Sequence, residues 1–199
     1  MHPNPMFRSD DRTLFETLIA EIGFGMVFQT TPDGPRVGHT PIVSTGDGAV
    51  QFHLARGNAL TRHLAGRDAL ILLNGPDGYV SPRWYADPAQ VPTWNYVALE
   101  LEGPVRRMDE EGTVALLRAI GEANEARIPG EPWTLDKTPT DYFRKLLSGI
   151  VAFELEVRAW RPTLKLSQNK PPEERARIAE ALQAGGALAI AQLMRTLAA

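Results

Sequence analysis

The chain has 199 residues, of which 43% are hydrophobic and 23% charged, with a formal net charge of −3 and no cysteine. This length is sufficient for one hydrophobic core, and the composition is typical of a globular protein. The lack of cysteine excludes disulfides, thiolate metal ligands and cysteine nucleophiles, and the acidic balance gives no overall attraction to nucleic acid. The first residues lack the pattern of a signal peptide, and no stretch approaches the ~20 apolar residues that span a bilayer. We therefore expect a cytoplasmic protein without a membrane segment.

The first part of the chain predicts a helix followed by strands joined by tight turns. The segment Ser9-Asp10-Asp11 is a typical helix start, because carboxylates are favoured at the positive end of the helix dipole. Gly23 is a natural stop for that helix. Asp47-Gly48 is a strong hairpin signal. We expect strands over residues 24–30, 37–43 and 49–54.

The middle of the chain predicts a short helix, buried strands and a loop rich in aromatic residues. Asn58 is expected to cap a helix over residues 59–65, and the apolar run 69–73 predicts a strand buried on both faces. Residues 79–96 hold two tryptophans, three tyrosines and three prolines, and proline excludes an ordinary helix or central strand there. These aromatic side chains suit a platform for a flat ligand or a subunit interface, or they cap a barrel end. The chain returns to strand over residues 94–105.

The last part of the chain predicts helices around one further strand. Asp109 is expected to open a helix, and Thr138 is a candidate cap for the next one, with Pro139 in its first turn. Residues 150–160 alternate between apolar and polar, which is typical of a half-buried antiparallel strand. Asn169 is expected to cap a C-terminal helix that is interrupted at Gly185-Gly186 and followed by another.

These elements together predict a mainly β fold with flanking helices. About six strands with short hairpin turns favour a closed or nearly closed antiparallel barrel with the helices packed outside it. The sequence shows no linker that would divide the chain. We therefore expect a single domain over residues 1–199, with a helical appendage at about residues 165–199.

Few residues indicate a specific chemistry, and none can be named as catalytic because the common nucleotide-binding, hydrolase and zinc-protease motifs are absent. His39 and His53 lie on neighbouring predicted strands, but no Asp or Glu accompanies them, so we expect no metal site. Arg56 follows a strand end and precedes the predicted short helix. That position suits a phosphate group, but it also suits an ordinary surface arginine. Lys165 and Gln168 could face an anionic or amide-bearing ligand, or they could simply belong to the cap of the next helix.

Three motifs taken together resemble a known family. HLARGN at residues 53–58, YVSPRWY…VPTWNY at residues 79–96 and KLSQNK at residues 165–170 occur in this order and at these separations in PaiB-like proteins. Members of that family are described as FMN-binding negative transcriptional regulators. The resemblance covers nearly the whole chain. It implies a split antiparallel β-barrel of the kind shared with pyridoxine phosphate oxidase, forming a homodimer with FMN in grooves between the subunits.

The resemblance also implies where FMN would lie. The flavin ring would contact an early strand, the phosphate would lie near the strand-to-helix turn that follows the next strand, and the partner subunit would add aromatic and amide groups. The candidate cofactor residues are Gly38, His39, Thr40 and Pro41 for the ring, Phe52, His53, Arg56 and Asn58 for the phosphate, Trp94 and Asn95 as the partner subunit's contribution, and Lys165 and Gln168 at a ligand edge. Pyridoxine phosphate oxidases usually carry an Arg-Lys pair at the phosphate turn, whereas this chain has Arg56, with Arg62 as a candidate substitute.

Two functions are compatible with these expectations. The first is a regulatory flavoprotein that modulates transcription. The second is a flavin-dependent oxidoreductase acting on a small molecule with NAD(P)H or another donor, because the flavin supplies hydride chemistry with little help from protein groups. A haem-handling barrel would need an axial ligand, and no residue stands out as one. Basic residues near the start of the C-terminal helix alternate with glutamates, so tight direct binding to DNA is not expected.

Overall fold

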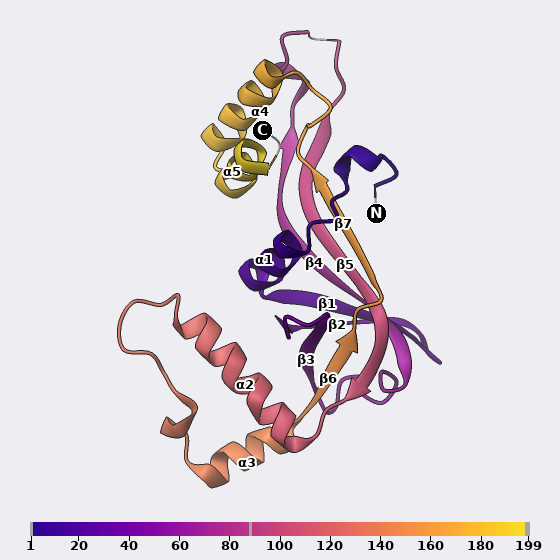
Figure 1. Cartoon of the computed structure of the whole chain (residues 1–199), viewed down its shortest axis with the longest axis vertical. Helices are drawn as coiled ribbons and strands as arrows, with labels where there is room; N and C mark the ends of the chain where they lie inside the picture. Colours follow the sequence, from indigo (N-terminus) through magenta and orange to yellow (C-terminus); the bar gives the residue numbers. More distant parts are fainter. Residues whose placement is uncertain (1, 88, 198–199) are drawn as a thin grey trace. The chain divides into compact units, whose positions relative to one another are not determined.

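The computed structural model describes residues 2–87 and 89–197, which form strands and flanking helices (Figure 1). The strands are β1 Phe24–Thr31, β2 Gly34–Ser44, β3 Ala49–Ala55, β4 Arg67–Val80, β5 Thr93–Arg107, β6 Ile150–Glu156 and β7 Ala159–Lys165. The helices are α1 Arg12–Ile22, α2 Glu110–Glu125, α3 Thr140–Ser148, α4 Pro172–Ala184 and α5 Leu188–Leu197, with short 3₁₀ turns η1 Pro5–Phe7, η2 Pro82–Trp84 and η3 Leu135–Lys137.

The strands close on themselves. They follow the order β4-β1-β2-β3-β6-β5-β7 in one sheet, and β4 also pairs with β5. Because β4 is therefore bonded to both β1 and β5, the strands from β4 round to β5 form a ring, and β7 is added beside β5. This arrangement confirms the predicted mainly β fold with flanking helices and a split antiparallel β-barrel.

Glycines shape the hairpins that start the barrel. In the β1–β2 hairpin the register runs from Phe24 opposite Pro41 to Thr31 opposite Gly34, and Gly34 has a φ of 95°. Between β2 and β3, Gly46 and Gly48 have φ values of 78° and 105°, a region that L side chains rarely adopt. The hairpin predicted from Asp47-Gly48 is thus confirmed.

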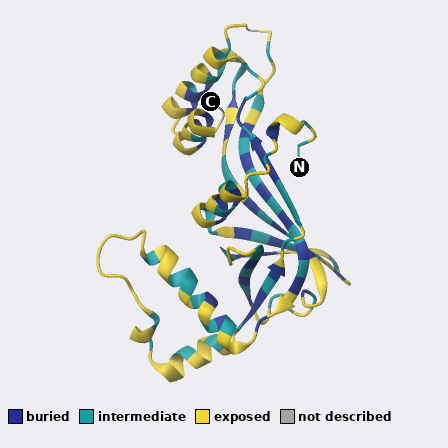
Figure 2. Ribbon diagram, in the orientation of Figure 1, coloured by how far each residue is buried: buried dark blue, intermediate teal, exposed yellow. Residues whose placement is uncertain are grey.

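The barrel interior holds the alternate apolar residues that the strand pattern predicts. Phe52 and Phe153 are fully buried and stack with their ring centroids 5.6 Å apart. Along β5, Val97, Leu99 and Leu101 are fully buried, and buried and partly exposed residues alternate along the strand (Figure 2). This period of two is what places one face of a strand inside a barrel.

The chain divides into two compact units. Unit 1 contains the described residues up to Phe15, those of Asn74–Leu99 and those from Arg161 onward; unit 2 contains Glu16–Leu73 and Glu100–Trp160. In unit 1, α4 packs against α5, and a Cβ on Gly78 of β4 would lie only 2.7 Å from Leu182. In unit 2, α2 lies against β2, β3 and β6.

Several predicted boundaries are wrong for identifiable reasons. Residues 59–65 form successive turns rather than a helix, and their bonds include Thr61 N to Asn58 O. The strand predicted over residues 150–160 is two strands, because Val157 N donates to Gly48 O and Arg158 N to Glu102 O at the break. Neither α3 nor α4 has a side-chain cap; a proline precedes each of them, so Thr138 and Asn169 are not caps.

The cap predicted for α2 is confirmed, since Asp109 accepts a hydrogen bond from Gly112 N at 2.8 Å. At the start of α1, Asp11 accepts a bond from Leu14 N at 3.1 Å. None of the helices in the described part of the chain has the length and apolar character needed to cross a bilayer.

Candidate functional site

The strand expected to contact the flavin ring is β2, whose residues differ sharply in exposure. A Cβ on Gly38 would lie 2.9 Å from a Leu54 methyl and 3.2 Å from a Leu60 methyl, so a larger residue there would require these leucines to shift. Thr40 is buried, and its hydroxyl donates to the His53 carbonyl at 2.5 Å. His39 is exposed and Pro41 half-buried. Of these residues, His39 and Pro41 present the accessible face of β2.

His53 on the neighbouring strand β3 carries an unsatisfied polar atom. It lies opposite Ala152 of β6, and its Nδ1 is buried without a hydrogen-bond partner among the described residues. Burial also lowers the pKa of His53 below its usual value, because the charged ring would lose its hydration. Buried polar atoms are normally bonded, so an unpaired one is consistent with a missing ligand. Among the described residues, no three His, Asp or Glu side chains gather where a metal ion would fit.

The remaining phosphate candidates follow the end of β3. The Phe52 side chain points into the barrel, whereas Arg56 is exposed. The Arg56 guanidinium donates from Nε to Ser148 O at 2.7 Å and from Nη2 to Ile150 O at 3.1 Å. Asn58 accepts a bond from Leu60 N at 2.9 Å and closes a turn. Since no helix follows, the helix N-terminus expected beside Arg56 is absent, and a phosphate there would depend on side chains.

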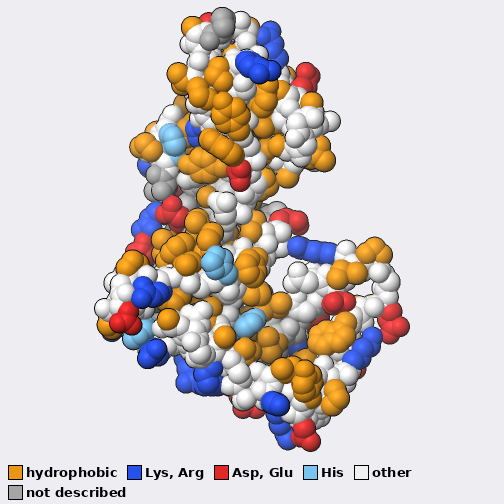
Figure 3. Space-filling model, turned by 180° about the vertical axis from the view of Figure 1, so that it is seen from behind, with side chains coloured by type: hydrophobic (Ala, Val, Ile, Leu, Met, Phe, Trp, Pro, Cys, Tyr) orange, Lys and Arg blue, Asp and Glu red, His pale blue; other side chains and the backbone are white. Residues whose placement is uncertain are grey.

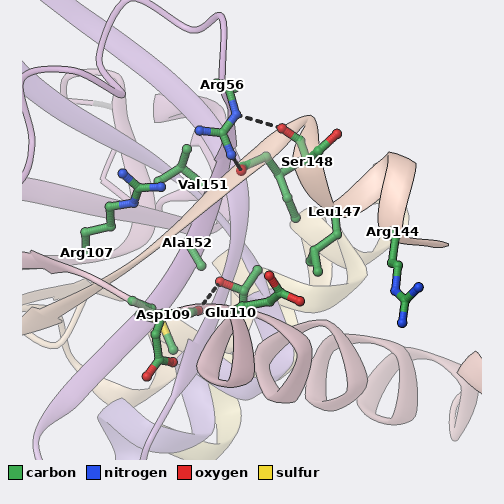
Figure 4. Close-up of a pocket in the computed structure, with 12 residues that line it drawn as sticks. Arg56, Arg107, Asp109, Glu110, Arg144, Leu147, Ser148, Val151 and Ala152 are labelled. Carbon is green, nitrogen blue, oxygen red and sulfur yellow. Dashed lines mark hydrogen bonds between the residues drawn. The ribbon is translucent and has the colours of Figure 1, made fainter. Parts of the chain in front are cut away.

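Arg56 lines a cavity of about 550 Å³ within unit 2. Figure 4 shows that its arginines come from different elements: Arg56 follows β3, Arg107 ends β5, and Arg144 lies on α3. Two carboxylates, Asp109 and Glu110, also line the cavity, and Asp109 is already engaged as the cap of α2. The guanidinium groups of Arg56 and Arg107 could hold a phosphate, because planar N–H forks match its oxygens, whereas Arg144 pairs with Asp141 at 3.7 Å.

The other predicted cofactor residues lie in unit 1. Trp94 is 53% exposed, and its ring meets that of Tyr79 edge-on at 6.0 Å. Asn95 is fully buried, and Lys165 donates to the hydroxyl of Thr93 at 2.6 Å and to the carbonyl of Trp94.

The Gln168 amide is used within its own turn. It accepts from Leu166 N at 2.8 Å and donates to the Leu164 carbonyl. Gln168 therefore shapes the polar segment after β7, and its amide has less capacity left for a ligand than the sequence suggests.

The structure brings each predicted set together within its own unit. The candidates on β2 and β3 lie on neighbouring strands of unit 2, and of these only Arg56 lines the 550 Å³ cavity, whereas Asn95 and Lys165 line one pocket of unit 1. Sequence reasoning did not single out Arg107 and Arg144, because their approach to Arg56 depends on how β5 and α3 reach β6. It also missed Ser167, whose φ of 63° is unusual for a residue other than glycine.

Comparison with known proteins points to a single family. A sequence model described as "Putative FMN-binding domain" matches residues 1–159. The chain is 30% identical over 169 residues to the protease synthase and sporulation protein PAI 2 of Bacillus subtilis (strain 168), which covers 83% of this chain and 81% of the relative.

Solved structures share the fold at low sequence identity. The flavocytochrome Anf3 from Azotobacter vinelandii matches with a TM-score of 0.63 and 14% identity, over 88% of this chain and 78% of that one. The FAD and heme binding protein from Mycobacterium smegmatis matches with a TM-score of 0.61 and 18% identity, over 85% and 78%. At these identities the likeness extends to the arrangement of the strands and helices.

Proposed function

Since the chain belongs to the PaiB-like family of FMN-binding proteins, whose cofactor is a flavin, we propose that it is a homodimeric flavoprotein of the negative transcriptional regulator type. The family match over residues 1–159, which includes β2, β3 and the aromatic stretch, supports the flavin-binding part of this proposal. The flavin would supply redox chemistry, and the chain would supply binding and orientation.

The residues of unit 2 suit a flavin with its phosphate. The accessible part of β2 offers His39 and Pro41 to a flat ring, and the unpaired Nδ1 of His53 offers a hydrogen bond beside them. The cavity that holds Arg56 and Arg107 offers guanidinium groups to the phosphate. In this proposal Gly38 and Thr40 keep β2 and β3 in register and are not themselves selective for the cofactor.

We place the regulatory effect in the flavin or in a protein partner rather than in direct contact with DNA. Binding to DNA depends on neutralising several phosphates with a basic patch. At the start of α4, however, Glu173 and Glu174 follow Lys170, and Arg177 pairs with Glu174 at 3.5 Å. Figure 3 shows basic and acidic side chains scattered over the face it presents rather than gathered by sign.

The homodimer would be formed through the aromatic stretch. Tyr79, Val91 and Trp94 are 45%, 76% and 53% exposed, which is high for large apolar side chains. Aromatic residues are enriched at subunit interfaces, where they contribute much of the binding energy. Light scattering at micromolar concentration would show a dimer, and a monomer would contradict this part of the proposal.

An absorbance spectrum of the purified protein, with and without added FMN, tests the cofactor. Bound flavin should shift and sharpen the flavin bands in a saturable titration, and an unchanged spectrum would contradict flavin binding. Adding NAD(P)H to the loaded protein then separates the proposed regulator from the oxidoreductase. Rapid bleaching of the flavin would favour the oxidoreductase, and persistence of the oxidised bands would favour the regulator.

A further inference from the structure

A second pocket, lying wholly within unit 1, shares no lining residue with the Arg56 cavity and contains two of the predicted cofactor residues, Asn95 and Lys165. Its volume is about 290 Å³. The side chains that line it come from the N-terminal segment, the aromatic stretch and the turn after β7. They include Phe7 and Tyr85 as aromatic walls, Lys165 and Lys170 as cations, and the buried Asn95.

The pocket is cationic although the chain as a whole is acidic. Its lining contains Lys165, Lys170 and His2 but no carboxylate. Neither lysine forms an ion pair with a described residue. Burial, and to a smaller extent the nearby Glu174 carboxylate, raises the pKa of Tyr85. The Glu174 carboxylate already accepts a hydrogen bond from Ala86 N at 3.0 Å and pairs with Arg177.

Each lysine is held in place by neutral groups. Lys165 donates to Thr93 and to the Trp94 carbonyl, and burial lowers its pKa because the ammonium loses hydration. Lys170 donates to the Gln90 amide oxygen at 2.9 Å and lies 5.0 Å from the centre of the Tyr85 ring. Bringing positive charge out of water without a counter-charge is unfavourable, and an anion in the pocket would relieve that cost.

The wall beside the lysines is held by buried hydrogen bonds. Asn95 is fully buried, and its amide nitrogen donates to the Ser167 hydroxyl at 2.9 Å, while that hydroxyl lies 3.1 Å from the Asn95 amide oxygen. Ser167 has a φ of 63°, in the left-handed region. Backbone held in a sparsely populated region by surrounding bonds is a feature of preorganised sites.

The aromatic walls suggest what accompanies the anion. The buried Phe7 meets the His2 ring edge-on at 4.7 Å, and the Lys165 ammonium lies 6.0 Å from the centre of the Phe7 ring. The Lys170 ammonium lies above the face of the Tyr85 ring. Because Phe7 is buried, the half-buried Tyr85 is the aromatic side chain that a flat ring can reach, and an ammonium group can form charge-assisted hydrogen bonds to oxygens.

We propose that this pocket in unit 1 binds a small ligand in which a phosphate or carboxylate group is attached to a flat ring. The inference does not depend on the Arg56 cavity, because it rests on the lysines, the hydrogen-bonded Asn95–Ser167 wall and the aromatic surfaces of one unit. The anionic group has two candidate sources, the phosphate of FMN itself or a separate aromatic anion. Phenyl phosphate is a suitable probe, because it carries both features and lacks the flavin.

The test is a calorimetric titration of the full chain with phenyl phosphate at constant ionic strength. Lys170→Gln removes the charge while retaining a hydrogen-bonding group, and it should weaken binding by about tenfold or more, as expected for the loss of a charge-assisted bond. Lys145→Gln is the matched control, because it removes the same charge from an exposed position on α3 in unit 2 and should leave affinity unchanged. Circular dichroism melts show that each variant is folded.

Three results would overturn the proposal. They are equal affinity in the Lys170→Gln and Lys145→Gln variants, an absence of saturable binding to the wild-type chain at millimolar probe, and loss of probe binding in Arg56→Ala with retention in Lys170→Gln. Competition then identifies the source of the anion. If saturating FMN displaces phenyl phosphate, the pocket recognises the flavin phosphate; if both bind together, the pocket serves a separate anion. Flavin binding without probe binding would leave the proposed function intact while rejecting this inference.

Discussion

The substitution Arg56→Ala offers a sharp test of the cofactor site, because Arg56 is assigned both a structural and a binding role. Its guanidinium donates to Ser148 O at 2.7 Å and to Ile150 O at 3.1 Å, and its backbone N–H donates to Gly149 O at 2.8 Å. The side-chain bonds reach the end of α3, where a cation is favoured by the helix dipole. The substitution removes the side-chain bonds but keeps the backbone one.

The expected magnitudes differ between stability and binding. The carbonyl bonds are solvent-exposed, so their loss should lower the free energy of unfolding by only about 1 kcal/mol. Loss of a charged hydrogen bond to the FMN phosphate should cost about 1.5–3 kcal/mol, which corresponds to a dissociation constant raised by about tenfold to a hundredfold. Arg56→Lys should recover part of the affinity, because it keeps the charge but not the planar fork.

Flavin fluorescence titration measures the binding change, and urea denaturation measures the stability change. Arg195→Ala is a matched control, since Arg195 is an exposed arginine on α5 in unit 1. Unchanged FMN affinity in Arg56→Ala, with the protein folded, would refute the assignment of Arg56 to the phosphate. The cavity residues Arg107 and Arg144 would then be the next candidates.

Four further outcomes are expected. Gly103→Ala should lower the free energy of unfolding by more than about 3 kcal/mol in urea, because the new Cβ would lie 1.8 Å from Glu156 O; a near-wild-type midpoint would contradict this. Burial lowers the pKa of His53, so the unfolded chain takes up its proton more readily. The wild type should therefore lose stability relative to His53→Gln as the pH falls below about 7, and parallel pH profiles would exclude the effect. Trp94→Ala should lower the molar mass measured by light scattering from that of a dimer toward that of a monomer, and an unaltered dimer would place the interface elsewhere. Gel shifts at roughly physiological salt should show no DNA binding tighter than micromolar, and sub-micromolar selective binding would reveal a local basic patch.

Local patterns in the sequence were sufficient to predict most of the fold. The period of two placed Val97, Leu99 and Leu101 inside the barrel, and all are fully buried. Turn chemistry predicted the hairpin at Asp47-Gly48, where Gly48 has a φ of 105°. These predictions are confirmed because strand alternation and turn glycines depend on residues only a few positions apart.

Predictions failed where distant segments decide the local conformation. Residues 59–65 form turns in which Leu60 and Leu64 are fully buried, so packing overrides the helical pattern. The strand predicted over residues 150–160 breaks because residues 150–156 pair with β3, whereas Arg158 N donates to Glu102 O of β5. Short-range propensity is weak compared with burial and with completed strand pairing.

The sites depend even more on tertiary structure. Arg56 bonds to carbonyls more than ninety positions away, and Asn95 bonds to Ser167 across seventy-two. The sequence motifs identified segments that line the cavities, since HLARGN supplies Arg56 to one cavity and KLSQNK supplies Lys165 and Lys170 to another. Only the folded chain determined that Arg56 shares its cavity with Arg107 and Arg144. Hydrogen bonds and charges act over a few ångströms of space, and the closure of the barrel decides which residues come within that distance.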